Sequence, residues 1–458
     1  MKTARPSSRG LWTSLLVSAV LTGCGGSNGP SPRSSSPAGS ESKGTIDSSF
    51  GVQGVATMEG FSWGGSVTDI LPINGGSGGY LVAGQGPFIA KLTDDGRLDP
   101  SFGLAGVDPT RRGNAASDVR LVALADGRYL AVETQHDGIC IGSPFICSVA
   151  PSGELMARRI DATGVLDPTY GQQGLARLYR AEGAIVVSAS GRLASFAMRP
   201  QLMESAIFAV ASLDAGGIED IGFENRALAA VEDCMAKTPG GGLVYAVTAA
   251  QAGAQIVVAA KFFATFGPPL LCVTRLNEDG TLDTSFAGNG YQIYPMDVSN
   301  LLPFRVLIRS DGEIVVVLGT PADQPQQLDP PQFVFLAPSG ARDTSVLVNG
   351  IQTKATLPIP KFRDVLLQSN GKILAAGLDG ATTNPFNPRD EKNPKIARVS
   401  PTADPLDSGF GPMGSGYAPL ITSAGELVPQ KVVVDREGSI IVGGHLTPSL
   451  DGAVVKLR

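Results

Sequence analysis

The stretch Leu98-Asp99-Pro100-Ser101-Phe102-Gly103 decides the fold, because close copies of it recur along the chain. We call this stretch the phrase. Clear copies begin at Ile46, Leu166, Leu282 and Leu406. A segment that returns at intervals of roughly 50 to 70 residues is typical of one supersecondary unit used many times. The sequence therefore predicts a repeat architecture.

The segments on either side of the phrase repeat as well. An apolar run ending in a basic and an aliphatic residue precedes it, as in Phe88 to Leu92 and Cys272 to Leu276. A polar turn with glycine, such as Thr93 to Gly96, joins this run to the phrase. Between phrases lie pairs of apolar runs separated by Asp-Gly, Asn-Gly or Glu-Gly, which indicate β-hairpins. Each unit thus offers four strands.

Two worn copies of the phrase complete the series, at Asp220-Ile221-Gly222-Phe223 and at Arg342-Asp343-Thr344-Ser345. The anchoring aspartates then stand at positions 47, 99, 167, 220, 283, 343 and 407. Seven four-stranded units over residues 44–458 predict an all-β fold, a seven-bladed β-propeller. An open solenoid is the alternative, but no polar capping repeat is visible.

The two ends of the region indicate a closed ring. The last apolar run, Val454 to Leu457, stands where a further phrase should follow, and the unmatched phrase is the one at Ile46. We expect the N-terminal strand around Val52 to Thr57 to complete the blade built by residues 428–458. Such pairing removes the exposed edges that an open array would leave.

The first 43 residues predict export and anchoring rather than a fold. Basic residues up to Arg9 precede a short apolar stretch, Leu11 to Leu21, which is too short for a membrane span. Leu21-Thr22-Gly23-Cys24 resembles the lipobox of bacterial lipoproteins, so residues 1–23 are expected to be a signal peptide. Cys24 is expected to carry the lipid, and the membrane is the partner that this lipid implies. Residues 24–43 then form a tether rich in Ser, Gly and Pro.

The repeat resembles the delta-60 repeat of bacterial secreted and surface proteins, and the resemblance covers essentially everything after the tether. It implies a β-propeller and an envelope or extracellular setting, with no catalytic residues to carry over. Lipoprotein families further imply outer-membrane sorting, because Gly25 rather than Asp follows Cys24.

The net charge and the few residues able to carry chemistry argue against several classes of function. The formal net charge is −6 without a strong basic cluster, which argues against nucleic-acid binding. The two histidines, His136 and His445, fall in different units, and no Gly-x-Ser-x-Gly motif supplies a nucleophile. We therefore name no catalytic, cofactor-binding or metal-binding residue. The segment Asp94 to Asp99 superficially resembles a calcium-binding loop, but it lacks the full spacing of ligand residues and the terminal bidentate Glu of such loops.

Four units place a basic residue eight or nine positions before the phrase aspartate, as in Lys91 and Asp99, and the two worn units lack it. One hypothesis is a ring of charged ligand sites. The other, which a feature copied in every blade favours, is an ion pair or Asx-turn that fixes the turn.

Four cysteines follow Cys24. Export permits disulfides, and Cys140 and Cys147 flank a short loop, so these two form a possible disulfide. Cys234 and Cys272 are expected on strands at opposite ends of one blade, and hence unpaired.

The function that fits these observations is a binding or scaffolding module: a lipid-anchored β-propeller of the bacterial cell envelope, facing the periplasm or the cell surface. Its partner is expected to be an envelope protein or polysaccharide. The alternative is a propeller enzyme, a hydrolase or lyase, whose charged side chains converge at the mouth of the central channel. Two oversized polar inserts, 320–332 and 380–394, are candidate recognition loops.

Overall fold

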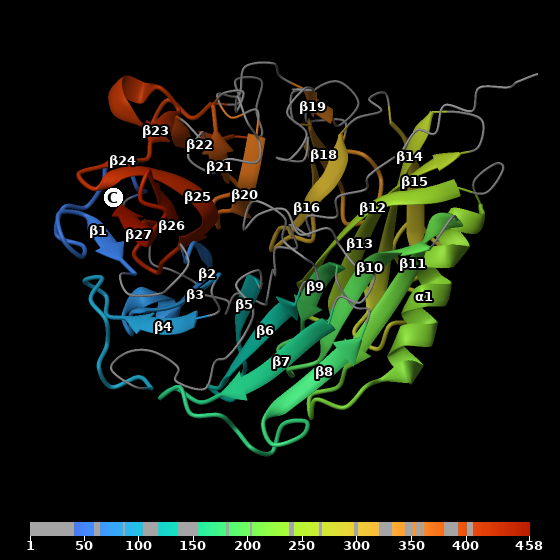
Figure 1. The fold of residues 1–458 in the computed structure, drawn as a ribbon. Coiled ribbons are helices and arrows are strands. Elements are labelled where there is room, and N and C mark those ends of the chain that lie inside the picture. The colour runs from blue at the N-terminus through green and yellow to red at the C-terminus, as the bar shows by residue number, and fades with distance from the viewer. Residues whose placement is uncertain are drawn as a thin grey trace, which may run out of the picture.

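The computed structural model gives a β-propeller of seven antiparallel sheets (Figure 1). It describes residues 41–58, 65–85, 88–103, 118–135, 154–179, 183–201, 204–237, 242–264, 268–296, 301–319, 332–343, 351–353, 359, 361–379, 393–400 and 406–458.

We number the blades in chain order. The strands of blades 1 to 3 are β2 (Val67–Pro72), β3 (Tyr80–Gly84) and β4 (Phe88–Leu92); β5 (Asp118–Ala123), β6 (Tyr129–Gln135), β7 (Glu154–Ile160) and β8 (Leu175–Tyr179); and β9 (Gly183–Val187), β10 (Leu193–Gln201) and β11 (Glu204–Leu213). Those of blades 4 and 5 are β12 (Gly242–Ala252), β13 (Gln255–Ala264), β14 (Pro269–Asn277) and β15 (Tyr291–Pro295); and β16 (Leu302–Ile308), β17 (Ile314–Gly319), β18 (Gln332–Leu336) and β19 (Ile351–Thr353). Those of blades 6 and 7 are β20 (Lys361–Leu367), β21 (Ile373–Leu378), β22 (Pro394–Val399) and β23 (Tyr417–Pro419); and β24 (Ile421–Thr422), β25 (Gly425–Val434), β26 (Ile440–Thr447), β27 (Gly452–Leu457) and β1 (Val55–Thr57).

The first long strand of each blade lies nearest the common centre of the sheets. Contacts join β2 to β5 and β25, β12 to β9 and β16, and β20 to β16 and β25. Between neighbouring blades the sheets bury interlocking apolar side chains, such as Leu307 of blade 5 with Val365 of blade 6. Burial of aliphatic surface of this kind supplies most of the favourable free energy of folding.

The ring closes as the sequence predicts. β1 pairs antiparallel with β27, so that one sheet contains both the N-terminal and the C-terminal strands. The backbones of Thr45 and Arg458 exchange two hydrogen bonds, of 3.0 and 2.8 Å, beside this pairing. The last blade is therefore completed by the first described strand, and neither partner is left with a free edge on that side.

The phrase joins each blade to the next. Its aromatic ring is buried, and it lies against a glycine in the turn between the third strand and the phrase of the following blade. A Cβ on any of these glycines would come within 2.8–3.0 Å of the ring, and their φ angles of +81° to +87° also favour glycine. The aromatic–glycine pairs are Phe50–Gly96, Phe102–Gly164, Tyr170–Gly217, Phe223–Gly280, Phe286–Gly340 and Phe410–Gly44.

Blade 3 departs from the predicted four strands. After its phrase the chain forms a helix, α1 (Ile221–Ala236), which packs against the outer side of β11 (Figure 1). Asp220 caps the helix, because its side chain accepts a hydrogen bond of 2.9 Å from the backbone N–H of Phe223. The buried face of α1 consists of Phe223, Ala227, Ala230, Val231 and Cys234, a spacing that only a helix brings to one side.

The prediction that Cys234 and Cys272 are unpaired is wrong. The two cysteines form a disulfide, with Cα atoms 6.5 Å apart. The error follows from the helix, because Cys234 lies on α1 rather than on an inner strand, and α1 contacts β14, where Cys272 lies. The bond thus ties the helix of blade 3 to the third strand of blade 4. Cys24, Cys140 and Cys147 lie outside the described residues.

Removal of this disulfide by the double substitution Cys234→Ala/Cys272→Ala is expected to lower the free energy of unfolding by about 2–4 kcal/mol, since the bond closes a long loop. Urea unfolding followed by circular dichroism measures the loss. Peptide mapping of the non-reduced wild-type protein should recover the linked Cys234 and Cys272 peptides. Protein purified from an oxidising compartment with both thiols free would contradict the pairing.

Candidate functional site

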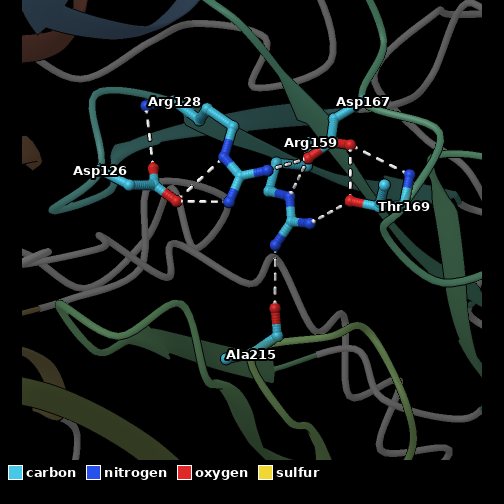
Figure 2. Close-up of polar contacts among 6 residues, drawn as sticks. All are labelled: Asp126, Arg128, Arg159, Asp167, Thr169 and Ala215. Atoms are coloured by element: carbon cyan, nitrogen blue, oxygen red, sulfur yellow. Dashed lines mark hydrogen bonds and ion pairs between the residues drawn. The ribbon is translucent and has the colours of Figure 1, made fainter.

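The charged residues around the phrase form a clasp between blades (Figure 2). In blade 2, Nε of Arg159 lies 2.7 Å from Oδ2 of Asp167, and its Nη2 donates a hydrogen bond to Thr169. Its Nη1 donates to the carbonyl oxygen of Ala215, in the next blade, at 3.0 Å. Arg128, held by Asp126, contacts the same carboxylate of Asp167. One guanidinium thus fixes its own turn and the following one.

The same clasp recurs in alternate blades. Arg275 binds Asp283 at 2.8 Å and the carbonyl oxygen of Pro338, in blade 5, at 2.7 Å. Arg398 binds Asp407 at 2.5 Å and the carbonyl oxygen of Ser42, in the closing segment, at 2.8 Å. Each of these arginines also stacks over the phrase aromatic of its own blade, with distances of 4.8 to 4.9 Å to the ring centroid.

The phrase aspartates are held as anions by these contacts. In blade 1, Lys91 donates to Asp99 at 2.7 Å, and with Ser101 it lowers the pKa of that carboxyl to about 2. The hydroxyl and backbone N–H of Thr169, followed by Arg159, hold the pKa of Asp167 well below its usual range. In each clasp the aspartate and the cation bind each other and nearby groups of the turn. The clasps therefore favour the structural hypothesis, an ion pair that fixes the turn, over a ring of charged ligand sites.

Blade 3 keeps the clasp by substitution. Ser212 stands where Lys91, Arg159, Arg275 and Arg398 stand in other blades, and Arg192, from the β9–β10 hairpin, binds Asp220 instead and stacks over Phe223 at 5.3 Å. Arg226 of α1 donates to the carbonyl oxygen of Asp279 at 2.9 Å, where other blades use a backbone N–H of the phrase. The worn phrase therefore still fastens blade 3 to blade 4.

A second set of charged residues converges near the common centre, and sequence reasoning missed it. These residues occupy the same register position on the first strands of five blades, each opposite the fourth residue of its second strand. We call them the axial charge ring: Asp69, Arg120, Arg305, Asp364 and Lys431. Four of the five are at most 8% exposed, and Arg120 is half-buried.

Ion pairs and inter-blade hydrogen bonds link the ring into a chain. Nη2 of Arg305 in blade 5 contacts Asp364 in blade 6, whose other oxygen accepts the N–H of Val432 in blade 7 at 2.9 Å. Lys431, the residue before Val432, lies 3.2 Å from Asp69 in blade 1.

The chain continues in blade 2. Oδ2 of Asp69 accepts the N–H of Leu121 at 2.7 Å, and Arg120 is the residue before Leu121. The order of charges from blade 5 through blade 2 therefore alternates in sign and ends on the cation Arg120.

The environment of Lys431 reflects this arrangement. Burial lowers the pKa of Lys431 to about 8, Asp69 acts against that change, and the charges of Arg305 and Arg120 reinforce it. Several cations thus share one weakly hydrated region. Charges so placed are rare unless they are paired or serve a ligand.

The residues singled out from the sequence do not join this ring. His445 is buried on β26, with Nδ1 3.4 Å from the hydroxyl of Ser66, and burial lowers its pKa to about 3. It is therefore neutral near pH 7 and unsuited to proton transfer there. His136 lies outside the described residues, as do the inserts 320–332 and 380–394 except for their last residues.

Within the described ranges, no group of three or more His, Cys, Asp or Glu side chains is placed to hold a metal ion. The helices found there include none with the length and apolarity to cross a membrane.

The fold and the ring define a seven-bladed β-propeller with buried charges at its centre. A model of the family described as "Domain of unknown function (DUF5122) beta-propeller" matches residues 255–286. No curated protein matches the sequence.

Solved structures match across most of the chain at low identity. The "Structure of Dos1 propeller" is 9% identical with a TM-score of 0.43, covering 86% of this chain and 78% of that one. The Trypanosoma rangeli sialidase in complex with the inhibitor DANA is 8% identical with a TM-score of 0.40, covering 80% of this chain and 57% of that one. Prolyl oligopeptidase B from Galerina marginata is 10% identical with a TM-score of 0.35, covering 83% and 55%. The chain thus spans little more than half the length of these two enzymes.

Proposed function

We propose that the protein is a lipid-anchored binding module of the bacterial cell envelope, tethered through Cys24 and presenting the propeller to an envelope protein or polysaccharide. The observation that carries the binding role is the axial charge ring, in which five blades bring buried charges together. The clasps fasten neighbouring blades through the phrase, whereas the ring ends on Arg120, a cation without a carboxylate partner among the described residues.

Two features support the envelope setting. The sequence places a lipobox-like segment and a tether before the fold, and the Cys234–Cys272 disulfide suits an oxidising compartment. The described chain enters the propeller at Glu41, which pairs with Lys372 at 2.7 Å, so a tether ending there leaves the ring complete.

The ring favours binding over catalysis. Asp69 accepts the N–H of Leu121 on one oxygen and meets Lys431 on the other, and Asp364 is engaged in the same way by Val432 and Arg305. A general base needs a lone pair directed at its substrate. The oxygens of both ring carboxylates are instead turned toward protein groups.

Metabolic labelling with a palmitate analogue tests the anchor. The wild-type protein should incorporate the label and sediment with membranes, and Cys24→Ser should do neither, because the thiol is the acyl acceptor. The Cys140→Ser/Cys147→Ser variant is the control and should be labelled like the wild type. An unlabelled wild-type protein would overturn the lipid anchor.

The binding role is tested by retention from an envelope extract on the immobilised full chain. We expect the wild type to retain a component that the tether without the propeller, residues 24–40, does not. Deletion of 380–394 shows whether this insert supplies the contact surface. Equal retention by the tether alone would contradict a binding role for the propeller.

A further inference from the structure

The axial charge ring is incomplete in one direction. Along a strand, residues two apart point to the same side. Arg305 shares a side with Leu307, which packs against blade 6, and finds Asp364 there. Lys431 shares a side with Val433, which packs against blade 1, and finds Asp69 there. Each of these two cations therefore faces a carboxylate on the next blade.

Arg120 follows the same geometry but meets no carboxylate among the described residues. It shares a side with Val122, which packs in one cluster with Ile185 and Val187 of blade 3. The residue of blade 3 at the ring position, opposite Phe196, is Ala184. In the part of the chain that the structure describes, the guanidinium of Arg120 has no hydrogen bond or ion pair.

The formal charges of the ring do not cancel. The ring contains three cations and two carboxylates, so it carries one formal positive charge in excess. Blade 4 does not neutralise it, because the residue opposite the fourth residue of β13 is Ala249, and the neighbouring Thr248 is uncharged and donates its hydroxyl to the carbonyl oxygen of Phe304 in blade 5. Arg120 is also the ring member with the most solvent access.

We propose that Arg120 binds an external carboxylate, which takes the place that Asp364 and Asp69 occupy beside the other two cations. This inference rests on the proposed binding function and names its ligand class. A carboxylate fits because it has the shape and the single charge of the group that completes the alternation elsewhere in the ring. A planar guanidinium binds such a group through two parallel hydrogen bonds.

A carboxylate can reach this site as a free acid or as part of an acidic polysaccharide, and the experiment separates the two. Isothermal titration calorimetry on the full chain in detergent uses D-galacturonate and polygalacturonate as probes, with D-galactose as the neutral control. We expect an acid to bind and galactose not to bind. Binding should fall at least tenfold in Arg120→Gln and recover in part in Arg120→Lys.

Arg97→Gln is the matched control, because it removes the same charge from an exposed arginine outside the axial charge ring, paired with Asp95, and it should bind like the wild type. Binding of the monomer assigns the site to free acids, and binding of the polymer alone assigns it to polysaccharide. An affinity unchanged in Arg120→Gln overturns the proposal, and so does binding of sulfate or phosphate without binding of either acid. If the propeller retains an envelope component but binds neither acid, the carboxylate site at Arg120 is wrong and the binding function stands. If it binds an acid but retains no envelope component, the carboxylate site stands and the proposed function is wrong.

Discussion

Replacing Asp364 by alanine is expected to lower the free energy of unfolding by about 3–5 kcal/mol. Asp364 is 1% exposed, pairs with Arg305 and accepts the N–H of Val432 from the next blade. Its removal leaves a buried guanidinium without its counter-charge and a buried N–H without its acceptor. Each of these groups lost water on folding, and alanine offers no replacement for the carboxylate oxygen that it contacted. Urea unfolding measured by circular dichroism gives the change.

Asp379→Ala is the matched control. Asp379 also pairs with a basic residue, Lys395, but its side chain is 42% exposed, so we expect a loss below about 1 kcal/mol. Substituting both members of the buried pair, as Arg305→Met/Asp364→Leu, should recover the part of the stability that Asp364→Ala loses through the stranded charge, while the N–H of Val432 still lacks its acceptor. Equal losses in Asp364→Ala and Asp379→Ala would show that the ring contributes no more than a surface pair.

The architecture could be predicted from the sequence because the phrase has a physical task in each blade. Its aspartate accepts a backbone N–H that fixes a turn, as Asp99 does from Ser101, and its aromatic ring lies against a glycine in the next blade in the six pairs described above. The recurrence of these residues therefore marks the blades directly. The position of the phrase at Ile46 likewise predicted the pairing of β1 with β27, which the structure confirms.

The recurrence of the phrase could not predict the helix of blade 3, because the phrase that precedes this helix makes the same contacts as the phrases that precede strands. Asp220 and Phe223 keep their places in the clasp and under Gly280, yet Asp220 also caps α1. The signal lay downstream, in apolar residues spaced three or four apart between Phe223 and Cys234. The repeat pattern predicts a strand here, which places Cys234 far from Cys272, and so it does not predict the disulfide.

The axial charge ring has no motif, because its members come from strands far apart in the sequence. Only the common register brings them together. A signal was nevertheless present: in each of the five strands a charged residue directly precedes two aliphatic residues, as in Asp69-Ile70-Leu71 and Lys431-Val432-Val433. Burying a charged side chain in a strand costs free energy unless it is paired with an opposite charge. In a repeat fold, the equivalent position on the neighbouring blade lies close enough to supply that charge.

Removing residues 1–57 is expected to abolish cooperative unfolding of the propeller, whereas removing residues 1–40 should leave it intact. The longer deletion takes away β1, the backbone hydrogen bonds between Thr45 and Arg458, and Phe50, which is 1% exposed. Truncation of a buried Phe alone costs about 3–5 kcal/mol, and the edge of β27 would be exposed in addition. The shorter deletion removes no described residue and serves as the control.

Thermal denaturation and size-exclusion chromatography distinguish the two proteins, because an open ring should lose its sharp transition and associate through the free edge. A synthetic peptide of residues 41–58 added to the longer deletion should restore the transition, since it carries the phrase and the strand that close the ring. Phe410 supplies an internal check, because it packs against Gly44 of the same segment. Phe410→Ala should therefore weaken the effect of the peptide. Coincident melting curves for the two deletions would mean that the ring is held by its other blades and that closure adds little.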